Sequence, residues 1–252
     1  MDDLLSRALD LAEVRGAGYA DIRIVRTVQE RISLRNGVVD TLSVDESLGF
    51  GVRVLVNGCW GFASSHDLTG KEIDRITALA VDIAKASGTL SKGAVDLGPP
   101  VTNRGTYTTP IEEDPFTIST DHKLALLMDA DQRMAGVKGV RSRQGNMVFI
   151  KEEKTFANSE GAHVEQTVYE AGGGIAANAV GNNEIQRRSY PQSMGRQQGC
   201  AGWEYITAMD LPGNAERVAT EAVALLTADP CPSGIVTDII IGGAQLALQI
   251  HE

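Results

Sequence analysis

The last two residues of the sequence, His251 and Glu252, are the pair whose types and order most directly suggest chemistry. They follow Gly242-Gly243 and a short apolar stretch in which Ala247 and His251 stand four apart, as on one face of a helix. An imidazole on a helix can bind zinc, and the glutamate after it can act as general base on metal-bound water. A His-Glu pair by itself is more often a solvated chain end, so its meaning depends on the rest of the sequence.

Other candidate residues have simpler interpretations. The run Ser64–Asp67 contains serine, histidine and aspartate, but neighbours on a loop point apart, so we expect a helix-entry loop. Gly172–Gly174 lacks the Lys-Ser/Thr of a phosphate loop, which favours a bulge or a close backbone approach. His122 and His163 are predicted to lie at the surface. Arg187-Arg188 is predicted to lie on a solvated face, with contact to a peptide carboxylate as the alternative.

Composition limits the class of protein. The 252 residues are 42% hydrophobic and 22% charged, which suits a globular protein with a sizeable core. A formal net charge of -10 argues against a nucleic-acid partner. Cys59, Cys200 and Cys231 form no CxxC pair, which indicates reduced thiols. Without a signal peptide or a long apolar run, we expect a cytoplasmic protein with no membrane contact.

The first third of the chain predicts a helix, a β-meander and a second helix. Helical spacing of apolar residues covers 2–15, and Gly16 can end that helix. Alternating residues over 21–64, with hairpin signals at Asn36-Gly37 and Asn57-Gly58, predict about four antiparallel strands. A helix over 69–87 has a capping box that begins at Thr69.

The remainder predicts a connector and a second region of mixed structure. Residues 88–118 hold four prolines and no strong periodicity, and a helix over 120–135 should begin at Thr120 or Asp121. Strands with glycine-rich loops or bulges follow over 139–206, then a helix after Pro212 that runs to about residue 226. Ile235–Ile241 predicts a buried strand, and 244–252 a last helix.

These elements predict an α+β fold with mainly antiparallel sheets and helices packed on one face. We divide the chain into an α+β part at 1–90, a proline-rich connector at 91–118 and a second α+β part at 119–252.

An ordered set of short motifs resembles the TldD/PmbA family of metallopeptidases. The motifs are Gly16–Asp21, Arg35–Val39, Gly49–Val54, Trp60–Ser65, the turn Asn158–Gly161, and the strand-to-helix entry Gly242–Glu252. No single motif is specific, but together they cover almost the whole chain in the family's order. The resemblance implies an N-terminal-domain-like fold of that family.

The resemblance also implies a function. A TldD-type enzyme is a zinc-dependent peptidase of the cytoplasm that acts on unfolded or modified peptides. It works as a homo- or hetero-dimer with a TldD/PmbA-type subunit. In its HExxxH motif two histidines, with a cysteine of a C-terminal domain, hold the metal. Only His251, as a metal ligand, and Glu252, as the catalytic residue, match positions of this sequence. None of the three cysteines is carried over.

The sequence ends inside that motif, which leads to further expectations. We expect a truncated chain without the C-terminal domain, with no stably bound zinc and no proteolysis of its own, because a catalytic zinc site needs about three protein ligands. We also expect exposed apolar surface around Ile235–Ile250. Two alternatives stay open: a non-catalytic PmbA-like partner or peptide-binding and dimerisation module, and an unrelated α+β binding domain. The His251-Glu252 ending favours the TldD-type peptidase.

Overall fold

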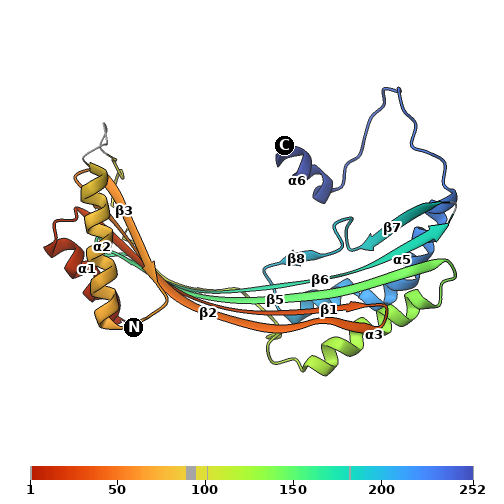
Figure 1. The fold of residues 1–252 in the computed structure, drawn as a ribbon, viewed down its shortest axis with the longest axis horizontal. Coiled ribbons are helices and arrows are strands. Elements are labelled where there is room, and N and C mark those ends of the chain that lie inside the picture. The colour runs from red at the N-terminus through yellow and green to blue at the C-terminus, as the bar shows by residue number, and fades with distance from the viewer. Residues whose placement is uncertain (1, 89–94, 101, 182, 252) are drawn as a thin grey trace. The chain divides into compact units, whose positions relative to one another are not determined.

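A computed structural model describes residues 2–88, 95–100, 102–181 and 183–251 of the chain (Figure 1). Its α-helices are α1 (Asp2–Val14), α2 (Gly70–Gly88), α3 (Thr120–Ala135), α4 (Trp203–Met209), α5 (Leu211–Ala224) and α6 (Gly243–His251). Its strands are β1 (Tyr19–Arg35), β2 (Val38–Val56), β3 (Cys59–Ser65), β4 (Arg104–Thr108), β5 (Val140–Asn158), β6 (His163–Gly181), β7 (Glu184–Tyr190) and β8 (Gln197–Gly199). None of the described helices is both long and apolar enough to cross a membrane.

Two Asn-Gly turns set the first hairpins. Asn36 and Gly37 have φ of 50° and 74°, and Asn57 and Gly58 have φ of 51° and 77°. Both turns therefore have the positive φ pair of a type I′ turn, which confirms the two predicted hairpins. The prediction of about four strands was wrong, because β2 runs unbroken from Val38 to Val56 and the meander has three.

The strands form one sheet in the order β3-β2-β1-β5-β6-β4, with β7 and β8 also paired to β6. The pairs β2–β3, β6–β7 and β6–β8 are antiparallel, whereas β4 runs parallel to β6. The α+β fold with a mainly antiparallel sheet is thus confirmed. Strand β4 lies within the predicted connector 91–118, where no strand was expected. All five residues of β4 are exposed, so pairing with β6 forms this strand without a buried apolar face. Residues 91–94 and 101 of the connector lie outside the described residues.

The chain forms two compact units. The first unit contains residues 1–29, 45–109 and 150–169, and the second contains 30–44, 110–149 and 170–252. The long strands β1, β2, β5 and β6 each contribute residues to both units. The units are therefore not continuous in sequence, and the division at 1–90, 91–118 and 119–252 stays a prediction about domains.

In the first unit α1 and α2 pack on one face of β1, β2 and β3. Apolar residues from these elements form a single buried cluster that includes Leu5, Ile22, Val52 and Ile76. Gly61 of β3 allows α2 to approach, since a Cβ there would lie 2.0 Å from the carbonyl oxygen of Ala80. Figure 1 shows α1 and α2 side by side in this unit.

In the second unit α3, α4 and α5 cover one face of β1, β5 and β6. Their shared cluster includes Ile32, Phe149, Ile175 and Trp203, and the Phe149 and Trp203 rings lie 5.9 Å apart. Helix α4 was missed, because 139–206 was predicted to be β-structure. Its Trp203 is buried by the rest of this core, a contact that sequence periodicity does not reveal.

Two local expectations in the second unit need correction. Helix α3 is capped by Ser119, whose side chain accepts from the N–H of His122, rather than by Thr120 or Asp121. Gly172–Gly174 lie within β6 and are buried, so a loop was the wrong prediction here. The alternative of a close backbone approach is confirmed: a Cβ on Gly174 would lie 2.2 Å from the carbonyl oxygen of Gly195.

Candidate metal site

His251 is the last residue of helix α6. The helix begins after Gly242, whose carbonyl oxygen accepts from the N–H groups of Gln245 and Leu246 at 3.0 and 2.9 Å. The side chain of His251 is exposed to solvent. The predicted catalytic residue, Glu252, lies outside the described residues, so its role stays a prediction.

The segment before α6 is extended chain with exposed apolar side chains. The buried strand predicted for Ile235–Ile241 was wrong, since this segment has no strand and Val236 and Ile240 are fully exposed. A buried strand needs a neighbour for its backbone groups, and no described strand pairs with it. The predicted exposure of apolar surface around Ile235–Ile250 is confirmed.

The donor set around His251 does not fit a metal site on its own. Among the residues that the structure describes, no group of three or more His, Cys, Asp or Glu is placed to hold a metal ion. Cys59 is buried in the first unit, and Cys200 and Cys231 are exposed free thiols of the second. One imidazole is fewer than the roughly three protein ligands of a catalytic zinc site, so we derive no step through a metal here.

The Ser64–Asp67 run forms no catalytic triad. Ser65 accepts from the N–H of Asp67 at 3.2 Å, as in the predicted helix-entry loop. The pKa of Glu72, on the first turn of α2, falls from 4.5 to about 2 because Arg75 and then Ser65 donate hydrogen bonds to its carboxylate. These contacts organise the start of the helix.

His122 is exposed as predicted, whereas His163 is half-buried. Arg187 and Arg188 are exposed, and Arg188 pairs with Glu221 at 2.6 Å, which confirms the solvated face. Sequence reasoning missed Arg23 and Phe62, which line a hollow in the first unit. The signal that could have found them is an arginine and an aromatic residue at strand positions that alternate with core residues.

The family comparison places the chain. Residues 20–84 match a model described as PmbA/TldA metallopeptidase domain 1, and residues 113–226 match the PmbA/TldA metallopeptidase central domain. Together the two matches span more than half of the chain. The chain belongs to the PmbA/TldD family.

Curated relatives agree with this assignment. A metalloprotease of Methanothermobacter thermautotrophicus is 30% identical over 237 residues, which cover 93% of this chain and 49% of that protein. A metalloprotease of Methanocaldococcus jannaschii is 26% identical over 235 residues, 93% of this chain and 50% of that protein. The chain thus spans about half the length of the curated relatives it matches.

The solved structures establish the fold. The structure of a candidate modulator of DNA gyrase from Thermotoga maritima superposes with a TM-score of 0.68 at 16% sequence identity. The match covers 92% of this chain and 50% of the Thermotoga chain. TldE from Thermococcus kodakarensis has a TM-score of 0.64 at 15% identity, covering 87% of this chain and 47% of its own.

Proposed function

We propose that this chain forms the N-terminal part of a TldD-type, zinc-dependent metallopeptidase that acts on unfolded or modified peptides. His251 supplies one metal ligand and Glu252 acts as the catalytic residue, while the other ligands come from residues outside these 252. The active protein is a cytoplasmic dimer with a TldD/PmbA-type subunit.

The observation that carries the proposal is the position of His251. It lies on helix α6 of a chain that belongs to the PmbA/TldD family, and several relatives of that chain are named metalloproteases. A histidine on a helix can supply its imidazole nitrogen to a zinc ion that also binds ligands from other segments. The exposed apolar segment Ile235–Ile250 supports the same view, because it offers a surface on which further protein can pack.

The test compares two polypeptides, the 252-residue chain and the protein at the full length of its relatives. We expect the longer protein to bind about one zinc and to cleave unfolded peptides in a chelator-sensitive manner. His251→Ala should abolish both zinc binding and cleavage, whereas His163→Ala, on β6 in the first unit, should change neither. Elemental analysis and a peptide-cleavage assay read out the two properties.

Two results would contradict the proposal. One is full zinc content and cleavage in the His251→Ala variant of the longer protein. The other is one tightly held zinc, or robust chelator-sensitive cleavage, in the 252-residue chain itself. A full-length protein without a second histidine shortly after Glu252, and without zinc, would instead support the non-catalytic PmbA-like partner.

A further inference from the structure

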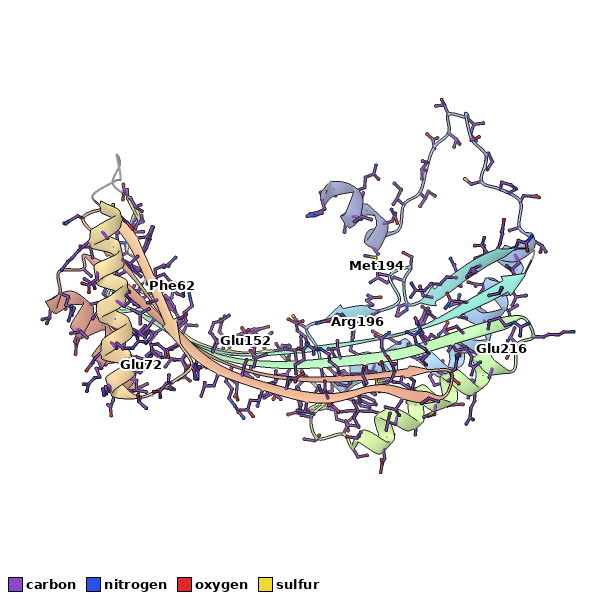
Figure 2. All side chains as sticks on the ribbon, in the orientation of Figure 1. Phe62, Glu72, Glu152, Met194, Arg196 and Glu216 are labelled. Carbon is purple, nitrogen blue, oxygen red and sulfur yellow. The ribbon has the colours of Figure 1, made fainter. Side chains whose placement is uncertain are left out.

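A hollow of about 500 Å³ lies on one face of the sheet in the first unit. Ile22 and Val52 point into the core beneath α1 and α2. Because side chains alternate along a strand, Arg23 and Gly51 face the other way. Phe62 of β3 lies on this same open face, and Figure 2 shows it on the side away from α2. We call this feature the open-face hollow.

The floor of the open-face hollow is shaped by two glycines of β2. A Cβ on Gly51 would lie 2.8 Å from the Phe62 ring, and a Cβ on Gly49 would lie 3.3 Å from the carbonyl oxygen of Ser65. The missing side chains let the Phe62 ring lie against β2 at Gly51 and let the Ser65 backbone approach Gly49, and Leu48, Phe50 and Val25 also line the hollow. Phe62 is 57% exposed, so it presents an aromatic wall to whatever enters. This combination suits a bulky apolar side chain.

The hollow is lined by Arg23 and by Asp21, and the Asp21 carboxylate is already bound by Arg53 from outside the lining. Asp21 is 1% exposed and accepts from Nε and Nη2 of Arg53 at 2.8 and 2.6 Å. Arg23 approaches the other Asp21 oxygen only to 4.0 Å. Two guanidinium groups therefore share a single buried carboxylate. The side chain of Arg23 is 47% exposed, and its guanidinium lies 5.1 Å from the centre of the Phe156 ring, which restrains it.

We propose that the open-face hollow binds an extended peptide segment in which a bulky apolar side chain stands next to an aspartate or glutamate. The apolar side chain occupies the hollow and packs against the exposed Phe62 ring. The carboxylate accepts hydrogen bonds from Arg23, whose planar fork matches that group. Aromatic residues and arginine are both enriched at protein interfaces. The chain carries a net charge of -10, so this cationic spot runs against its overall charge.

The test measures binding rather than proteolysis, so it is independent of the proposed metal site. Three labelled peptides are compared by fluorescence anisotropy on the 252-residue chain. The first has blocked ends and the core Glu-Phe-Leu-Glu, the second has Lys-Phe-Leu-Lys, and the third has Gln-Phe-Leu-Gln with a free C-terminal carboxylate. We expect the glutamate peptide to bind at least about tenfold more tightly than the other two.

Variants locate the site. Arg23→Gln and Phe62→Ser should each lower the affinity for the glutamate peptide by at least about tenfold. Arg26→Gln is the matched control, since Arg26 lies on the same strand but pairs with Glu46 and Glu153 at 2.7 and 2.9 Å and does not line the hollow. It should leave the affinity within about twofold. Circular dichroism checks that each variant is folded.

Several outcomes would overturn this inference. They are equal affinity for the glutamate and lysine peptides, unchanged affinity in folded Arg23→Gln, and no saturable binding below about 1 mM. A further outcome is that the glutamine peptide with a free C-terminus binds as tightly as the blocked glutamate peptide, or more tightly. That result would mean that Arg23 recognises a chain-terminal carboxylate, and it would also reject the inference.

Discussion

A buried ion pair offers the sharpest test of how the second unit is held together. Nζ of Lys123 on α3 donates to Glu30 on β1 at 2.5 Å, and the two side chains are 1% and 6% exposed. The ammonium group also lies 4.7 Å from the centre of the Phe149 ring. With almost no access to water, each charge depends on the other for its compensation.

Removing one partner should therefore cost more than removing both. Lys123→Met leaves the Glu30 carboxylate buried without its cation, and we expect a loss of about 3–5 kcal/mol in the free energy of unfolding. This is a large part of the roughly 5–15 kcal/mol that stabilises a typical domain. The double variant Lys123→Met with Glu30→Met replaces both charges by apolar groups of similar size. It should recover to within about 1 kcal/mol of the parent or exceed it.

The assay follows urea unfolding through one tryptophan at a time. The chain has two tryptophans, and Trp203 lies in the same core as Phe149 whereas Trp60 lies in the first unit. In a Trp60→Phe background, fluorescence therefore reports the unit that contains the ion pair. With a slope of about 2 kcal/mol per M of urea, the single variant should lower the midpoint by about 2 M. A loss below about 1 kcal/mol, or a double variant no more stable than Lys123→Met, would refute the reasoning.

Three further predictions test local features. Hydrogen bonds from Arg75 and then Ser65 lower the pKa of Glu72 to about 2. The ionised Glu72 side chain therefore contributes its full stabilisation above pH 4.5, and this contribution disappears as the pH falls towards 2. In Glu72→Gln the melting temperature should therefore depend less on pH between about 2 and 4.5 than in the parent chain. An unchanged dependence on pH would contradict this prediction. Gly61→Ala should cost about 1–3 kcal/mol or more in chemical denaturation, since its Cβ meets the backbone of α2, whereas Gly105→Ala, with open space at its Cβ, should be near neutral. Asp210→Ala should lower the free energy of unfolding by about 1 kcal/mol, because it removes the side-chain cap that accepts from the N–H of Gly213 at the start of α5. Asp210→Asn keeps an oxygen acceptor and should retain most of that stability. Equal losses in the two variants would reject the capping role.

Local signals in the sequence determined much of the secondary structure. The apolar spacing of 2–15 and 69–87 and the two Asn-Gly turns needed no knowledge of the fold, because helix periodicity and positive φ are properties of a few neighbouring residues. Family membership was predicted in the same way, from an ordered set of short motifs, and the two family matches confirm the membership.

Tertiary structure alone decided which residues meet. The exposed strand β4 exists because β6 is beside it, and Gly172–Gly174 remain in a strand because the Gly195 backbone lies against them. Lys123 looks like a surface residue of a helix, yet it is buried because Glu30, 93 residues away, lies opposite. The apolar run Ile235–Ile241 has the composition of a buried strand but no partner among the described residues. Burial and pairing depend on distant segments, and the sequence of one segment does not contain them.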